Sequence, residues 1–363
     1  MWENVLECIS QRETAICIPI PGGDPFPIYW YGVLAALGIF LGAFYASKHV
    51  EGEGGDPETV WDALLWIMLP ALLGARLWYV AQVALTSDSS PYSLAHPLEI
   101  LNPRLGGMNY FGGVIFALIA AFIYVRVKKL NFWLIADGGL MGLFIGHAIG
   151  RFGNWVNQEL YGPPIEVPWL QWLGVRIPEE HRLRAWSDMT TYPYETTRFH
   201  PTFFYEAFWL LLCFGVLYFL YRRYQARIIP GMLAGGYLIL AGIGRFVVET
   251  WRPDQPTLPG LPISISRIVA LVYVAIGIIF LLDRMGHMKI PFIKRPMTRK
   301  QRERAFQEIQ SERRRKARLA SREHERRQRT KAREKRAKEG VAETAEEPDE
   351  EVEEVAEEET SST

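Results

Sequence analysis

The sequence predicts an all-α polytopic membrane protein of about seven transmembrane helices, with the N-terminus outside and the C-terminus in the cytoplasm. Up to about residue 285, the chain alternates long apolar runs with short polar loops. The runs are roughly 18 to 25 residues long, the length that a bilayer core requires of a helix. Lys and Arg gather in alternate loops, as they do on the cytoplasmic side of a membrane protein.

This pattern divides the chain into three parts. Residues 1–27 are expected to form an exterior N-terminal segment, residues 28–285 a seven-helix membrane domain, and residues 286–363 a charged cytoplasmic tail. The tail is basic from about Lys294 to Lys338 and acidic from Glu343 to Glu359, so the net charge of zero averages two opposite segments. No basic start with an apolar core precedes the first run, so we expect the first helix to act as the insertion signal.

The apolar runs, taken in order, predict the individual helices. Pro70 lies inside the second run, where a membrane helix tolerates it as a kink if neighbouring groups satisfy the backbone. Glycine is frequent throughout, which suits close helix packing in lipid. Helices are expected over residues 28–48, 60–83, 108–127, 132–150, 201–221, 231–250 and 267–284.

Basic residues follow the first, third, fifth and seventh runs, and this sets the orientation. These ends are expected in the cytoplasm, so the N-terminus and the loops 84–107, 151–200 and 251–266 are expected outside. The long 151–200 loop carries arginines of its own, but long loops weigh less in this rule. The basic residues are Lys48, then Arg126, Lys128 and Lys129, then Arg222, Arg223 and Arg227, and finally the tail.

The three cysteines and the spacing of His and Cys indicate which disulfides and metal sites the sequence could form. Cys8 and Cys17 lie in the exterior segment, where a disulfide and two unpaired thiols are both open interpretations. Cys213 lies in an apolar run and is interpreted as a packing residue. We find no spacing typical of a metal site and no glycine-rich phosphate loop of the soluble kind.

Ionisable residues beside four of the runs form the candidate functional site, because charge at bilayer depth is costly and usually functional. By the expected topology they share one level near the exterior face, with Arg76 and Arg245 somewhat deeper. The four stretches are HAIGRFGNWVNQELYG at 147–162, LLGARLWYV with Arg76, AGIGRFVVETWRPD with Arg245 and Glu249, and RFHPTFFYEAF with His200, Tyr205 and Glu206.

Clustered arginines admit two interpretations. Arginine has a planar fork of donors suited to phosphate, and arginines at one level repel each other unless an anion lies between them. Glu159, Glu206 and Glu249 would serve as internal partners that hold helices together, whereas a lipid phosphate would be a ligand. The residues alone favour neither the internal ion pairs nor the lipid phosphate. The two interpretations are compatible if the carboxylates orient the arginines toward a phosphate.

Spacing within the first stretch favours a functional site. His147 and Arg151 are four residues apart and share a helix face. Gly150 and Gly153 flank the arginine and allow a ligand or another helix to approach closely. Asn154 and Asn157 are suited to hold a loop or bind an ester or phosphate oxygen. Helix termination and loop shaping are the alternative, which fits Asn157 better than Asn154.

The segment GRFGNWVNQELYG resembles the signature of bacterial prolipoprotein diacylglyceryl transferases, read as G-R-x-G-N-x-x-N-x-E-x-x-G. The resemblance covers about residues 28–285, and the family's seven helices and its topology agree with those expected here. Five further stretches resemble family segments in the same order: YWYG at 29–32, GARLWYV at 74–80, GGMNYFGG at 106–113, HPTFFYE at 200–206 and GRFVVETWRPD at 244–254.

The resemblance implies an enzyme that transfers the diacylglyceryl group of phosphatidylglycerol to the lipobox cysteine thiol of prolipoproteins and releases glycerol-1-phosphate. It implies the bacterial inner membrane as location, phosphatidylglycerol and prolipoprotein signal peptides as partners, and no metal or soluble cofactor. One alternative is a divergent lipid-binding or transport protein that uses the same arginines without transfer chemistry. Another is a membrane tether that acts through its tail.

The resemblance also implies roles for residues. Arg151 is expected to bind the lipid phosphate, with Arg245 as the second phosphate arginine. The remaining candidates are expected at the site for catalysis or lipid binding: Asn154, Glu159, Gly162, Tyr31, Asn157, Arg76 and Glu249.

Three positions depart from the family's pattern. Phe111 stands where many members have histidine, Ala241 where a tyrosine often precedes the second arginine, and Arg267 where the last helix often opens with glutamine. Because Phe111 cannot accept a proton, our hypothesis is that His147 or His200 supplies the polar or basic group. A hydrogen-bonded histidine at a helix end is an equally consistent interpretation of His147.

The tail from about residue 296 to 340 is expected to form a solvated helix with many i, i+4 charge pairs. Its basic part is expected to be drawn to anionic lipid head groups, because it follows the last helix on the cytoplasmic side. Ribosomes or nucleic acid are an alternative partner class, although no specific nucleic acid is expected. A solubilising tail without a partner is the simplest interpretation.

Overall fold

The computed structural model describes residues 7–8, 10–20, 24–86, 107–252, 263–289 and 299–343. The chain divides into two compact units, Met1–Glu303 and Arg304–Thr363. Within the described ranges, seven helices are long and apolar enough to cross a membrane. The predicted all-α multi-pass membrane protein is therefore confirmed. The acidic segment expected at 343–359 lies outside the described residues, apart from Glu343.

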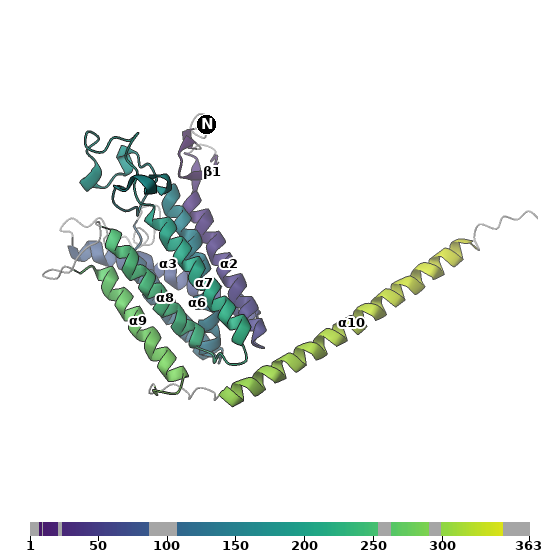
Figure 1. The fold of residues 1–363 in the computed structure, drawn as a ribbon. Coiled ribbons are helices and arrows are strands. Elements are labelled where there is room, and N and C mark those ends of the chain that lie inside the picture. The colour runs from purple at the N-terminus through teal and green to yellow at the C-terminus, as the bar shows by residue number, and fades with distance from the viewer. Residues whose placement is uncertain are drawn as a thin grey trace, which may run out of the picture. The chain divides into compact units, whose positions relative to one another are not determined.

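The seven spanning helices occur where the apolar runs predict them, with one difference that matters for the site. The fourth helix continues beyond its expected end at Gly150, so Arg151 and Asn154 lie on the helix itself. The helices are α2 (Trp30–Gly52), α3 (Glu58–Thr86), α5 (Tyr110–Val127), α6 (Phe132–Val156), α7 (Thr202–Tyr224), α8 (Met232–Val248) and α9 (Ile265–Arg284) (Figure 1).

A small hairpin precedes the first spanning helix, which the sequence analysis did not predict. Strand β1 (Thr14–Ile18) pairs antiparallel with β2 (Phe26–Tyr29), and β2 runs directly into α2. A disulfide joins Cys8 to Cys17 in β1, with the two Cα atoms 6.2 Å apart. The sequence left both a disulfide and two unpaired thiols open for these cysteines, and the structure contains the disulfide.

Glycines bring α2 and α6 into backbone contact. A Cβ atom added to Gly142 of α6 would lie 2.4 Å from the carbonyl oxygen of Gly42 in α2, and Gly38 meets Gly146 in the same way. Small residues of this kind allow helices to pack closely in lipid, where the hydrophobic effect between helices is weak. Helix α6 also packs on α7 and α8, while α3 pairs with α5 and α8 with α9.

One buried carboxylate fastens the start of α8 to α6. The two oxygens of Asp137 accept hydrogen bonds from the backbone N–H groups of Gly231 and Ala234, each at 2.7 Å. Gly231 has a φ of 100°, a conformation that favours glycine. The first turn of a helix has unsatisfied N–H groups, and Asp137 satisfies two of them from a neighbouring helix.

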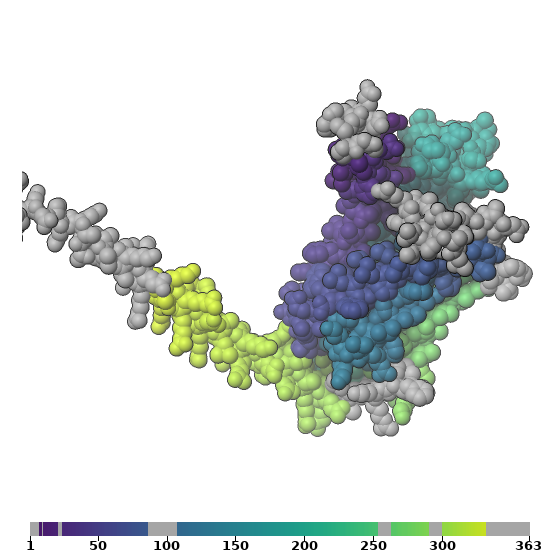
Figure 2. All heavy atoms as spheres, turned by 180° about the vertical axis from the view of Figure 1, so that it is seen from behind, coloured from purple at the N-terminus to yellow at the C-terminus, as the bar shows by residue number. Residues whose placement is uncertain are grey.

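Side chains on the outer face of α3 and α5 are apolar. Leu65, Trp66 and Leu69 on α3 are more than half exposed, as are Leu118 and Phe122 on α5. Figure 2 shows these two helices at the surface of the molecule, coloured in two shades of blue. Exposed apolar side chains along spanning helices are what contact with lipid tails requires.

A folded loop joins α6 to α7. It contains three short 3₁₀ turns, η2 (Pro168–Leu173), η3 (Glu179–His181) and η4 (Arg184–Trp186). Its small core consists of Tyr161, Ile177, Trp186, Phe199 and Phe203. Figure 1 shows this loop and the N-terminal hairpin at the same end of the helices.

The tail contains one long helix, α10 (Arg299–Glu343), which extends from the first unit into the second. Most described side chains from residue 304 to 331 are exposed. The predicted helix is therefore present, with a solvated surface.

Gly142→Ala tests the packing of α2 on α6. We expect a loss of about 2 kcal/mol of stability, because the new methyl group overlaps a backbone atom that cannot move aside. Gly139→Ala on the same helix is the control, since no atom lies within 4 Å of its added Cβ. Thermal unfolding in detergent measures both, and equal midpoints for the two variants would contradict the packing argument.

Candidate functional site

A carboxylate shared by two arginines lies at the centre of the polar residues. Glu206 Oε1 on α7 is 2.6 Å from Arg151 Nη2 on α6, and Glu206 Oε2 is 3.7 Å from Arg245 Nη1 on α8. Three helices that are distant in sequence therefore meet at one ion-paired group. We call Arg151, Glu206 and Arg245 the arginine–glutamate cluster.

The cluster is mostly, but not fully, shielded. The side chain of Glu206 is 10% exposed, whereas those of Arg151 and Arg245 are 20% and 28% exposed. A buried charge must be paired, and Glu206 provides part of the pairing for both guanidinium groups. Because an arginine has five donors in a planar fork, each retains capacity for another anion at its exposed edge.

A chain of amides and a second carboxylate orients Arg151. Arg151 Nη1 donates to Asn154 Oδ1 at 3.2 Å, and Asn154 Nδ2 donates to Glu159 Oε1 at 2.8 Å. Asn157, the residue directly after α6, donates to the same oxygen at 3.4 Å. Gln158 has a φ of 53°, so the backbone turns sharply here and brings Glu159 back toward the helix. Four predicted site residues are therefore connected.

Arg245 is held from α8 and α9. Its Nη2 atom lies 3.2 Å from Glu249 Oε2, one turn further along, and 3.4 Å from Ser266 Oγ. Ser264 donates to the other Glu249 oxygen at 2.8 Å. Arg267, at the position where the family's pattern has glutamine, donates to the backbone carbonyl of Glu249 at 3.5 Å. Helix α9 therefore supports the second arginine.

Two further predicted residues make close packing contacts. The ring of Tyr31 on α2 lies against Gly153, where an added Cβ would be 2.5 Å from Tyr31 Cδ2. This places Tyr31 beside the turn of α6 that carries Arg151. Gly162 lies farther along the loop and donates its N–H to the carbonyl of His200 at 2.8 Å. A Cβ at Gly162 would meet Thr202 at 2.9 Å, so the start of α7 requires glycine there.

The two candidate histidines have different surroundings. His200 Nδ1 lies 3.0 Å from the Tyr205 hydroxyl, and its ring stacks on Trp251 with ring centroids 6.2 Å apart. Partial burial lowers the pKa of His200 below its ordinary value, so the ring is neutral at neutral pH. His147 is exposed on α6, one turn before Arg151, and interacts electrostatically with Arg151 and Glu206.

Arg76 contacts the glycine-rich stretch from α3. Its side chain is buried on α3, and Nη1 donates to the carbonyl of Gly107 at 3.0 Å. Gly107 has a φ of 79° and lies against Tyr79, and Asn109 caps α5 and donates its N–H to the Ala75 carbonyl at 2.9 Å. The described part of the glycine-rich stretch is thus a tight turn packed on α3.

Sequence reasoning placed Glu206 among the polar residues of the candidate site and named it as an internal partner for the arginines, but gave it no role in catalysis or lipid binding. Ser264 and Ser266 were missed, since serines at a helix start are common. Tyr110 was also missed, although it interacts electrostatically with both arginines of the cluster and lies next to Phe111 in the glycine-rich stretch. In the described part of the chain, no three His, Cys, Asp or Glu residues form a group able to hold a metal ion.

Known proteins are similar in sequence to this chain over most of its length. The family model for prolipoprotein diacylglyceryl transferase matches residues 19–282. Similar proteins carry the name phosphatidylglycerol–prolipoprotein diacylglyceryl transferase. One from Bacillus cytotoxicus is 35% identical over 260 residues, which is 72% of this chain and 89% of that protein. One from Chloroflexus aggregans is 33% identical over 291 residues, which is 76% of this chain and 90% of that protein.

Glu206→Gln tests the shared carboxylate. We expect a loss of roughly 3 kcal/mol of stability, because the change leaves two partly buried arginines without their common counter-charge. Glu195→Gln is the control, since Glu195 pairs with Arg176 at 3.7 Å while 79% exposed, and such pairs contribute at most about 1 kcal/mol. Thermal unfolding in detergent compares the two, and a shift no larger for Glu206→Gln would show that the shared pair does not stabilise the helices.

Proposed function

The chain belongs to the prolipoprotein diacylglyceryl transferase family, and from this membership we propose that it transfers the diacylglyceryl group of phosphatidylglycerol to the cysteine thiol of prolipoproteins. The observation that carries the proposal is the arginine–glutamate cluster, whose three residues come from three of the stretches that resemble family segments. The protein is a multi-pass membrane protein, and we place it in the bacterial inner membrane with the cluster toward the outer face.

The cluster is suited to hold the phosphate of phosphatidylglycerol. Arg151 and Arg245 point to one carboxylate from two helices, and both expose part of their side chains. A phosphodiester at this exposed side accepts donors from both guanidinium groups, because arginine binds phosphate with two parallel hydrogen bonds. Glu206 then orients the arginines, and Asn154 with Glu159 keeps the Arg151 side chain in place.

The reaction forms a thioether and breaks an ester. The thiolate sulfur attacks the diacylglyceryl carbon that carries the phosphate, the carbon–oxygen bond breaks, and glycerol-1-phosphate leaves. Negative charge builds on the departing phosphate, and arginines that are already positioned in a site shielded from water stabilise it strongly. The thiol proton must be removed, since the thiolate is the nucleophile.

His147 is the better placed of the two histidines for that proton. His147 lies one helical turn from Arg151 with its side chain exposed. His200 is instead hydrogen-bonded to Tyr205 and stacked on Trp251. A base must come within hydrogen-bond distance of the proton that it removes, which favours an exposed ring beside the phosphate arginines. We propose His147 in this role and a structural role for His200.

The remaining candidates have supporting roles in this proposal. Tyr31 borders the lipid beside Arg151, Glu249 holds Arg245, and Asn157 helps to hold Glu159. Gly162 allows the loop to close on α7, and Arg76 holds the glycine-rich turn. A protein that binds or transports lipid without transfer chemistry is the alternative, and the names of the relatives do not favour it.

A purified-protein assay with phosphatidylglycerol and a lipobox peptide tests the proposal. We expect the diacylglyceryl-peptide by mass from the parent protein, and a fall of at least about 100-fold for Arg151→Ala, because a positioned charge at the leaving group is removed. Arg176→Ala is the control, since this half-buried loop arginine pairs with Glu195 at 3.7 Å rather than with Glu206.

Two outcomes would contradict the assay's expectation. Equal product from Arg151→Ala and Arg176→Ala would remove Arg151 from the site. A folded parent protein that binds phosphatidylglycerol yet forms no thioether and releases no glycerol-1-phosphate would support the binding or transport alternative.

His147→Phe and His200→Phe separate the two histidines. We expect His147→Phe to lower kcat by about 100-fold, the usual contribution of a positioned base. The loss should shrink at alkaline pH, where the peptide thiol ionises without help. His200→Phe should instead lower thermal stability and leave the pH profile of kcat unchanged. Full turnover by both variants would mean that neither histidine supplies the basic group.

The basic part of the tail is proposed to contact anionic lipid head groups. A peptide of residues 304–343 should bind vesicles of phosphatidylglycerol and phosphatidylcholine more tightly than vesicles of phosphatidylcholine alone, since each basic residue near a charged surface contributes about 1 kcal/mol. Salt should weaken the binding, and a peptide with glutamine at every Lys and Arg is the control. Equal binding to both kinds of vesicle would contradict the proposal and favour a tail that only solubilises the protein.

A further inference from the structure

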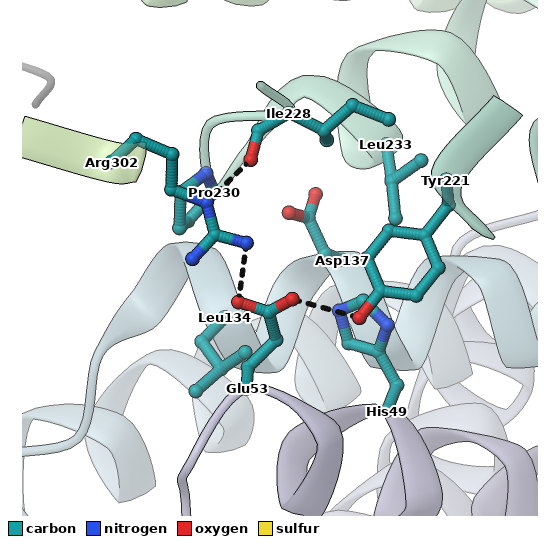
Figure 3. Close-up of a pocket in the computed structure, with 9 residues that line it drawn as sticks. All are labelled: His49, Glu53, Leu134, Asp137, Tyr221, Ile228, Pro230, Leu233 and Arg302. Carbon is teal, nitrogen blue, oxygen red and sulfur yellow. Dashed lines mark hydrogen bonds and ion pairs between the residues drawn. The ribbon is translucent and has the colours of Figure 1, made fainter. Parts of the chain in front are cut away.

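A buried arginine at the start of the tail helix forms an ion pair with the end of the first spanning helix. Arg302 Nη2 lies 2.7 Å from Glu53 Oε2, and the two side chains are only 4% and 5% exposed. Arg302 belongs to the first turn of α10 and to the first unit of the chain, whereas Glu53 is the residue directly after α2. Figure 3 shows Arg302 reaching between Ile228 and Glu53.

The surroundings match the donors of a guanidinium group. Arg302 Nε donates to the carbonyl of Ile228 at 2.9 Å, and Nη2 also donates to the carbonyl of Gln225 at 3.2 Å. The Glu53 carboxylate accepts further hydrogen bonds from the Tyr221 hydroxyl at 2.7 Å and from Gln225 Nε2 at 3.1 Å. Glu53 is therefore held in position independently of Arg302.

A small cavity borders this ion pair. Its volume is about 10 Å³, roughly the space of one water molecule. Figure 3 shows that His49, Glu53, Asp137 and Arg302 line it together. His49 Nδ1 is buried there, and in the described part of the chain it has no hydrogen-bond partner. Four side chains able to carry charge thus gather in the interior, at the end of the helices opposite the arginine–glutamate cluster.

We propose that Glu53, Tyr221, Gln225 and the Ile228 carbonyl form a guanidinium-binding socket, and that Arg302 fills it to fasten the first turn of the tail to the membrane domain. The socket draws its residues from α2 and α7 and from the segment that follows α7, beside the Asp137 contact that joins α6 to α8. The same four helices carry Tyr31, Arg151, Glu206 and Arg245 near their other ends.

The socket has a structural consequence for the tail. Its charged helix is not joined to the membrane domain only through the segment after α9, because the side chain of Arg302 forms a second attachment. Removing Arg302 would leave the Glu53 carboxylate buried with hydroxyl and amide partners but no cation. A buried charge that loses its partner destabilises a protein far more than the loss of an exposed pair.

Arg302→Ala in the full-length protein tests the socket, with Arg304→Ala as the control because Arg304 is exposed two residues further along α10. In detergent we expect the unfolding midpoint to fall by roughly 5 °C or more for Arg302→Ala and to stay unchanged for Arg304→Ala. Ethylguanidinium, at a concentration that does not affect the parent protein, should recover at least half of the fall. Ethylammonium should not, because it lacks the planar fork that reaches a carboxylate and two carbonyls.

Arg302→Lys provides a second variant if Arg302→Ala does not fold. It keeps the charge but not the fork, so its midpoint should fall between those of the parent and of Arg302→Ala and should not respond to ethylguanidinium. The proposal is overturned if Arg302→Ala unfolds like Arg304→Ala, or if ethylguanidinium and ethylammonium act alike on it. None of these readouts depends on transfer activity, so they test the socket separately from the proposed function.

Discussion

Glu206 is the group on which the arrangement of the membrane domain depends. Two arginines from α6 and α8 lie at the same depth and repel each other unless a negative charge lies between them, and Glu206 of α7 supplies that charge. A carboxylate that is 10% exposed and has two cationic partners requires α6, α7 and α8 to meet at one level. The remaining contacts either bring these helices together or orient Arg151 and Arg245, the two arginines that pair with Glu206.

The helices are tied near both ends. At one end the arginine–glutamate cluster joins α6, α7 and α8, and at the other Asp137 satisfies the start of α8 from α6. Between these ties, glycines allow α2 and α6 to touch along their backbones, which keeps Tyr31 against Gly153. A frame of this kind limits how far the two arginines can move apart, and a site that stabilises charge needs donors that are already in place.

The glycine-rich turn packs against α3 without a side chain that could transfer a proton. Gly107, Asn109 and Gly112 pack the turn against α3, and they do so with Phe111 in the place of an imidazole. Two side chains that interact electrostatically with Arg151 are His147 on α6 and Tyr110 beside the phenylalanine. The backbone of the turn therefore persists without the side chain that could accept a proton.

The sequence by itself determined the seven helices, because each apolar run is long enough to span a bilayer and the positions of Pro, Gly and charge delimit it. It also determined which stretches hold the polar residues, since charge is rare at bilayer depth. Only the tertiary structure decided that Glu206 is shared by Arg151 and Arg245, and that Arg302 is buried on Glu53. These pairings join helices far apart in the chain, and the 3.6-residue period that reveals a helix says nothing about which neighbour each of its faces meets.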